Sequence, residues 1–236
     1  MTAQFSPDIL CFMRFSKQAV AVAVEDITDC IASALNGEKT VLWLTSGGSC
    51  VDAQVRVMKR LRESVSSRLV NLSILPVDER YGVCGHADSN SEQMRQAGFA
   101  PDAAVWHDVL AGNLPFAETI DAYTEQAQAA FAAAEVVVAT LGMGADGHIA
   151  GLLPNSPAVR EMASSVVGYA WNDHERMTLG AAVLRQIDHV FLLVYGDTKQ
   201  TALTRLRANT ESFEDLPAKI LYDFDDVTIY NEYIQT

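Results

Sequence analysis

Residues 136–154, VVVATLGMGADGHIAGLLP, decide the fold and give the first indication of function. The apolar, β-branched run at their start is typical of a strand buried on both faces. The run stops at Gly142, and a glycine-rich turn then places Asp146 and His148 two residues apart. In an open parallel sheet, ligands bind outside the carboxyl ends of the strands. The stretch therefore predicts an acid and an imidazole at the ligand-binding edge of such a sheet.

The same turn matches the dinucleotide-binding pattern Gly-x-Gly-x-x-Gly, through Gly142, Gly144 and Gly147. A pyrophosphate bound there would lie next to the Asp146 carboxylate, which repels it. The helix that should follow can hardly extend beyond Pro154. We therefore expect neither a nicotinamide nor a flavin cofactor.

Composition favours a soluble globular enzyme, with 49% hydrophobic and 20% charged residues. Without a repeat or a linker, residues 1–236 are predicted to form a single domain. The apolar runs are too short for a transmembrane helix, and no secretion signal opens the chain. The four cysteines, Cys11, Cys30, Cys50 and Cys84, lack metal-binding spacing. We expect reduced thiols in a cytoplasmic protein without a metal site.

The formal net charge of −13 argues against nucleic acid and anionic membranes as partners. A phosphorylated ligand would need cations placed within the screening length of about 8 Å. The sequence contains no feature that predicts an oligomeric state.

Hydrophobic periodicity divides the chain into alternating strands and helices. This alternation predicts an α/β fold of three layers, Rossmann-like, with a mostly parallel sheet and helices on both faces. The expected strands are 41–45, 72–77, 136–141, 190–195 and 227–230, and the expected helices are 16–36, 50–65, 88–97, 116–134, 178–187 and 197–208.

Polar clusters follow four of these strands at their carboxyl ends. They are Ser46-Gly47-Gly48-Ser49, Asp78-Glu79-Arg80, Asp146-Gly147-His148 and Gly196-Asp197-Thr198-Lys199. Because a parallel sheet brings such ends to one edge, the sequence predicts that the clusters form one active site.

Each cluster has a binding and a structural interpretation. The two-glycine turn can receive an anion at a helix N-terminus, or can be a plain turn with Ser49 as the N-cap. Arg80 can bind phosphate or a developing oxyanion, or its cluster can be a solvated strand end with mutually paired charges. Lys199 and Arg176 are further candidate cations, or ordinary surface residues at helix starts. Ser89 or Asn90 can cap the helix that follows Arg80.

His148 is the candidate general base, and Asp146 can fix its tautomer or bind a substrate hydroxyl. The structural alternative is a hydrogen-bonded loop histidine. The other histidines, His86, His107, His174 and His189, have no comparable context and receive no role. Motifs for a serine nucleophile, a zinc protease and a P-loop are absent from the sequence. Hydrolysis would therefore use base-activated water.

With these residues identified, the chain resembles the 6-phosphogluconolactonases of the sugar-phosphate isomerase/deaminase superfamily. The matching pieces run in family order from about residue 40 to 220: the clusters at 46–49, 78–80, 88–90, 142–150 and 176–179, then Lys199 and Leu216-Pro217-Ala218. The related glucosamine-6-phosphate deaminases look like Asp-Glu-Tyr at 78–80 and Phe-Asn-Glu-Pro at 151–154. This chain has Asp-Glu-Arg and Gly-Leu-Leu-Pro there, which favours the lactonase.

The resemblance implies hydrolysis of 6-phospho-D-glucono-1,5-lactone to 6-phosphogluconate, without metal or cofactor. It implies catalytic roles for His148, Asp146 and Arg80. The implied substrate-binding residues are Ser46, Gly47, Gly48, Ser49, Asp78, Asn90, Gly144, Arg176 and Lys199. The alternatives are an amino-sugar-phosphate isomerase or deaminase, and a sugar-phosphate sensor without catalysis.

Overall fold

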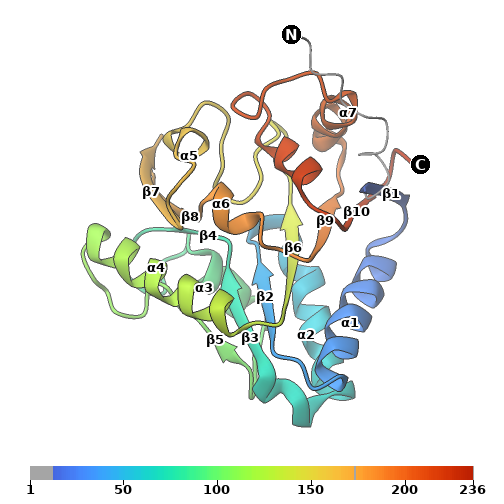
Figure 1. Cartoon of the computed structure of the whole chain (residues 1–236), viewed down its shortest axis with the longest axis vertical. Coiled ribbons are helices and arrows are strands. Elements are labelled where there is room, and N and C mark those ends of the chain that lie inside the picture. Colours follow the sequence, from blue (N-terminus) through green and yellow to red (C-terminus); the bar gives the residue numbers. More distant parts are fainter. Residues whose placement is uncertain (1–12, 173, 236) are drawn as a thin grey trace.

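The main sheet consists of parallel strands, and their carboxyl ends point to the top of Figure 1. The computed structural model describes residues 13–172 and 174–235. In spatial order the strands are β1 (Met13–Lys17), β10 (Val227–Asn231), β9 (His189–Val194), β6 (Val136–Gly142), β2 (Val41–Thr45), β3 (Leu72–Pro76) and β5 (Val105–Trp106). The five strands expected from the sequence are all present and form the centre of this sheet.

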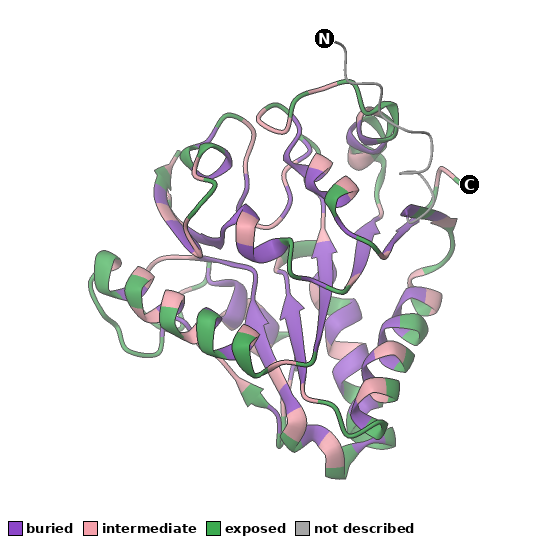
Figure 2. Ribbon diagram, viewed as in Figure 1, coloured by how far each residue is buried: buried purple, intermediate pink, exposed green. Residues whose placement is uncertain are grey.

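Helices cover both faces of the sheet because successive side chains along each strand point to opposite faces. On β2, Val41 and Trp43 pack into one apolar cluster, and Leu42 and Leu44 pack into the other. Figure 2 shows these strands buried and the outer helix faces exposed. The first cluster is covered by α1 (Val20–Asn36), α2 (Val51–Ser64) and α3 (Asn90–Gln96), and the second by α4 (Phe116–Ala133), α6 (Ala181–Leu184) and α7 (Gln200–Ala208). The predicted α/β architecture is confirmed.

A second, antiparallel sheet lies above α4 in Figure 1 and was not expected from the sequence. Its order is β4 (Asp78–Arg80), β8 (His174–Leu179) and β7 (Val166–Trp171). The predicted helix over 178–187 is wrong in its first part, since Thr178 and Leu179 end β8. The strand pairs with β7, its neighbour in the chain, and with the distant β4, and its own alternation is too short to indicate this.

The predicted helix over 16–36 begins later, at Val20. Met13 and Phe15 are buried while Arg14 is exposed, so the preceding residues form edge strand β1 instead. The shorter elements are α5 (Pro157–Arg160) and the 3-10 turns η2 (Gly48–Cys50), η3 (Ser66–Asn71), η4 (Asp197–Lys199) and η5 (Pro217–Asp223).

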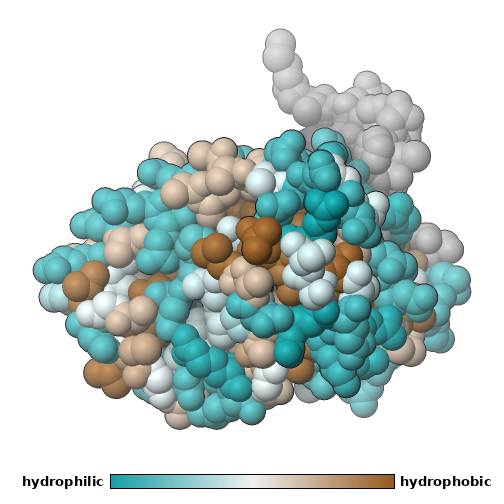
Figure 3. Space-filling view, turned by 90° about the horizontal axis from the view of Figure 1, so that it is seen from below, coloured by the Kyte–Doolittle hydropathy of each residue, from teal (hydrophilic) through white to brown (hydrophobic). Residues whose placement is uncertain are grey.

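The face at the amino ends of the strands is mostly hydrophilic, with hydrophobic residues only in small patches (Figure 3). Across the described ranges, no helix is both long and apolar enough to span a bilayer. The polar clusters singled out in the sequence lie at the other end of the sheet.

Candidate active site

A pocket of about 190 Å³ lies at the carboxyl ends of β2 and β6. Every predicted site residue lines it except Asp146 and Arg176, which lie behind the lining. The lining residues are Ser46, Gly47, Gly48, Ser49, Asp78, Arg80, Asn90, Gly142, Met143, Gly144, His148, Ala150 and Lys199. Segments from four different strand ends therefore meet around one small cavity.

The two-glycine turn after β2 is held by the buried side chain of Gln54. Its amide accepts a 2.8 Å hydrogen bond from Ser46 N and donates a 2.6 Å bond to Ser46 O. Gly47 lies so close to Asn90 that a Cβ would fall 2.0 Å from Asn90 Oδ1. Ser49 is not the N-cap of the following helix, since that position is Cys50, and Ser49 Oγ accepts a 2.8 Å hydrogen bond from Lys199 Nζ. The turn and the lysine thus form one side of the pocket.

The turn after β6 orients His148 through Asp146. Asp146 Oδ1 lies 2.7 Å from His148 Nδ1 and accepts a 3.1 Å hydrogen bond from His148 N. Gly147 has a φ of 91°, which favours glycine. With Nδ1 bonded to the carboxylate, Nε2 is the ring nitrogen free to act in the pocket. Partial burial opposes ionisation of Asp146, but the bond and charge of His148 lower its pKa to about 2.

Asp78 and Glu79 are buried, so the interpretation of a solvated strand end is wrong. The Glu79 carboxylate accepts hydrogen bonds from Arg80 N, Asn90 N and Ser91 N, of 2.9, 2.6 and 2.9 Å, and one from Ser89 Oγ. Burial raises the pKa of Glu79 although these bonds oppose the shift. This carboxylate joins β4 to the start of α3 and thereby fixes the backbone on both sides of the pocket.

Burial also raises the pKa of Asp78, against the opposing charges of Arg80, His148 and Arg176. Arg176 stands directly opposite Arg80 across the β4–β8 pair, in a strand and not at a helix start. Asn90 Nδ2 donates a 2.9 Å hydrogen bond to Asp78 O. The acid and both arginines therefore share one electrostatic environment.

Several buried polar atoms at the pocket have no hydrogen-bond partner. They are Ser46 Oγ, Arg80 Nε, Asn90 Oδ1 and Arg176 Nε. A buried polar atom left unpaired costs about 1–3 kcal/mol, which a polar ligand can recover. The arrangement is typical of a site for a small anionic ligand.

Sequence reasoning missed some functional positions. It gave no role to Gly142, Met143 and Ala150, although they line the pocket, or to Glu79, which supports it. The sequence could have indicated these four residues, because all of them lie in or beside the motifs already singled out.

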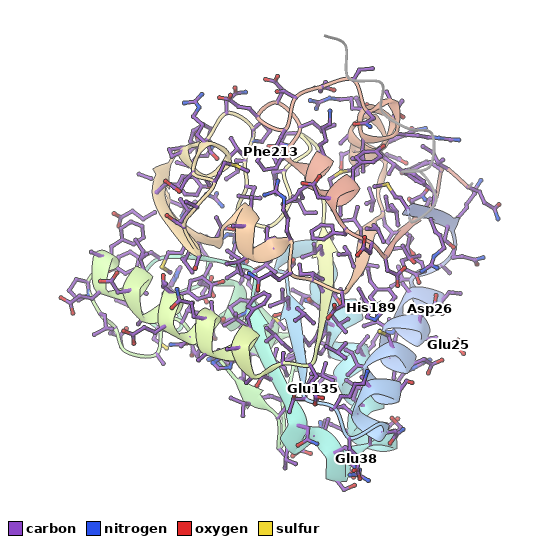
Figure 4. All side chains as sticks on the ribbon, in the orientation of Figure 1. Glu25, Asp26, Glu38, Glu135, His189 and Phe213 are labelled. Atoms are coloured by element: carbon purple, nitrogen blue, oxygen red, sulfur yellow. The ribbon has the colours of Figure 1, made fainter. Side chains whose placement is uncertain are left out.

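Two of the histidines without an assigned role differ in their distance from the site. His86 Nε2 lies 3.0 Å from Arg80 O and so contacts the loop after β4. His189 begins β9 at the amino edge of the sheet and is labelled with Glu135 in Figure 4. Its Nδ1 lies 2.8 Å from Asp226 Oδ2.

In the residues that the structure describes, no three His, Cys, Asp or Glu side chains gather as a possible metal site.

Comparison with known proteins gives both a sequence and a structural relationship. A 6-phosphogluconolactonase from Mycobacterium leprae is 30% identical over 203 residues, which cover 80% of this chain and 81% of that protein. A 6-phosphogluconolactonase structure from Thermotoga maritima matches with a TM-score of 0.75 and 19% identity, covering 93% and 99% of the two chains. A monomeric glucosamine-6-phosphate deaminase has the same TM-score at 17% identity, with coverages of 93% and 96%.

The family model described as glucosamine-6-phosphate isomerases/6-phosphogluconolactonase matches residues 15–230. This range contains every strand of the main sheet except the ends of β1 and β10, and all residues of the pocket. The chain therefore belongs to the family of glucosamine-6-phosphate isomerases and 6-phosphogluconolactonases.

Proposed function

We propose that the protein hydrolyses 6-phospho-D-glucono-1,5-lactone to 6-phosphogluconate. The observation that carries this proposal is the meeting of His148, Lys199 and the two-glycine turn in one pocket. A general base and an anion-binding surface are what a phosphorylated lactone requires. The 6-phosphogluconolactonase name of the Mycobacterium leprae relative supports the same substrate.

In the proposed reaction, His148 Nε2 accepts a proton from water as the water oxygen attacks the lactone carbonyl carbon. The ring C–O bond then breaks, and the imidazolium returns the proton to the leaving ring oxygen. Asp146 holds the imidazole in the tautomer that leaves Nε2 unprotonated, through its contact with Nδ1. A general base and positioning suffice for an ester that opens readily.

The phosphate is assigned to Lys199, the turn at 46–49 and Arg176. The turn presents backbone N–H groups at the start of α2, and Lys199 already reaches Ser49 Oγ. Arg80 is assigned to negative charge on the phosphate or on the carbonyl oxygen, and its unpaired Nε supports this. These local cations offset the repulsion that a net charge of −13 exerts on an anionic substrate.

The test is an assay with lactone generated immediately before use. Proton release is followed with and without protein at slightly acidic pH, where spontaneous opening is slow. The proposal expects a rate proportional to protein concentration. Ammonia release from glucosamine 6-phosphate would instead identify a deaminase, and lactone binding without turnover would identify a sensor.

The pH dependence follows from the low pKa of Asp146, about 2. Asp146 stays ionised down to about pH 4, so its contact with His148 Nδ1 should persist over the acid range of the assay. We expect the Asp146 carboxyl group to show no protonation step between neutrality and that pH. Carbon-13 spectra of the carboxyl carbon measure it, with Asp146→Asn identifying the signal, and a protonation midpoint above about pH 4 would contradict the assigned contact with His148.

Gly144→Ala should lower kcat while leaving the fold intact. The new Cβ would fall 2.1 Å from His148 Nδ1 and 2.5 Å from Asp146 Oδ1, so the pair must separate. A displacement of about 1 Å in a catalytic group can cost roughly a hundred-fold in rate. Gly37→Ala, at the end of α1, is the control and should keep wild-type kcat. Equal kcat in both variants would contradict the assigned geometry.

The proposal includes the surroundings in which the enzyme acts. We place it in the cytoplasm, with a small sugar-phosphate lactone as its substrate and with neither nucleic acid nor membrane as a partner. The acidic charge supports the absence of those two partners. Cys30, Cys50 and Cys84 are free thiols, as expected in a reducing compartment; Cys11 lies outside the described residues.

A further inference from the structure

The turn that carries Asp146 and His148 is held from outside by residues 205–218, none of which lines the pocket. Arg205 Nη1 donates a 3.0 Å hydrogen bond to the backbone carbonyl of Asp146. Ala218 N donates another, also 3.0 Å, to the carbonyl of Gly147. Figure 4 labels Phe213 in this segment, above strand β6. One side chain and one backbone N–H group outside the pocket therefore hold the turn.

The Arg205 guanidinium has a fixed direction because Glu211 binds it at two points. Nε donates to Glu211 Oε1 at 2.8 Å and Nη2 to Glu211 Oε2 at 2.5 Å. Glu211 is itself held by Lys219, whose Nζ donates a 2.6 Å hydrogen bond to its carbonyl. A bidentate pair of this kind adds geometric precision to its strength. Nη1, which makes no contact with Glu211, thus donates one of its two protons to the Asp146 carbonyl.

Helix α7 links this contact to the anion-binding side of the pocket. Lys199, at the N-cap of α7, contacts Ser49. Arg205 lies six residues further along, about 9 Å by helical rise. One short helix therefore carries both a phosphate-binding side chain and the support of the base.

We propose that Arg205, locked by Glu211, is a positioning residue for the Asp146/His148 pair. Its catalytic consequence rests on the proposed lactonase function. Without the guanidinium, the Asp146 carbonyl loses its partner and the carboxylate of the same residue is no longer held against Nδ1. His148 would then lose its fixed tautomer and its alignment with the attacking water.

The test is Arg205→Ala, assayed with and without added guanidinium at concentrations far below those that unfold proteins. We expect kcat to fall roughly ten- to hundred-fold with little change in KM. Guanidinium should restore part of the loss by occupying the vacated place between Glu211 and the Asp146 carbonyl. A merely structural role would give no such rescue. Arg207→Ala, on the same helix, is the matched control and should keep wild-type kcat.

A readout independent of turnover separates this inference from the proposed function. Long-range ¹H–¹⁵N correlation spectra report which imidazole nitrogen carries the proton, with His148→Ala identifying the signal. Wild-type protein should show the Nδ1–H form, and Arg205→Ala a mixture. If Arg205→Ala does not fold, Glu211→Ala should show the same change and a several-fold lower kcat. Wild-type kcat, an unchanged tautomer or a loss without rescue in the folded Arg205→Ala protein would overturn the proposal. So would wild-type kcat in Glu211→Ala.

Discussion

His148→Ala should lower kcat for the lactone by roughly 10²–10⁴-fold while changing KM little. The reason is that His148 is the only histidine among the pocket-lining residues, and a positioned general base contributes a factor of that size. The residues to which we assign the phosphate lie on other elements, so binding of the ground state should survive. Steady-state kinetics with freshly generated lactone measure both parameters.

The control for this substitution is His189→Ala, at the amino edge of the sheet, which should behave as the wild type (Figure 4). A loss expressed through KM alone in His148→Ala would show that the imidazole binds substrate and does not act as the base. Circular dichroism of both variants checks that the fold is retained.

Lys199→Met should weaken the phosphorylated lactone selectively. Lys199 Nζ donates a hydrogen bond to Ser49 Oγ beside the two glycines of the turn, so we assign its charge to the phosphate and not to the lactone ring. Removing one partner of a charged hydrogen-bonded pair costs about 2–5 kcal/mol, and we expect kcat/KM to fall roughly a hundred-fold. Unphosphorylated glucono-1,5-lactone should be hydrolysed equally well by the variant and the wild type.

Comparing the phosphorylated with the unphosphorylated lactone shows whether Lys199→Met weakens phosphate binding alone or impairs the enzyme in general. Lys39→Met removes the same charge at the opposite end of the sheet and should change neither rate, so it controls for net charge. An equal loss on both lactones in Lys199→Met would place the lysine at the reacting carbonyl. Such a result would contradict the assignment of Lys199 to the phosphate and of His148 to the reacting carbonyl.

The central sheet and most of the site follow from local sequence signals. Apolar runs such as Val136–Gly142 are long enough to identify buried strands, and the polar residues after them mark one edge. This convergence brought Ser46, Arg80 and His148 to one pocket. Whether they act as proposed is a separate question, which the substitutions address.

The second sheet could not be predicted because it combines a hairpin, β7 and β8, with a short strand from a distant part of the chain, β4. β4 is three residues long, and the residues of β8 carry charges that suggested a solvated helix start. The burial of Glu79 was hidden for a similar reason. Its partners are backbone N–H groups at 90 and 91, whose positions are set by the loop between β4 and α3.

The most direct test of the account is the position of bound 6-phosphogluconate in a crystal structure. We expect its phosphate against Lys199 and the turn at 46–49, with the carboxylate carbon within about 4 Å of His148 Nε2. A phosphate bound outside this pocket, or a carboxylate group beyond the reach of that nitrogen, would contradict the account.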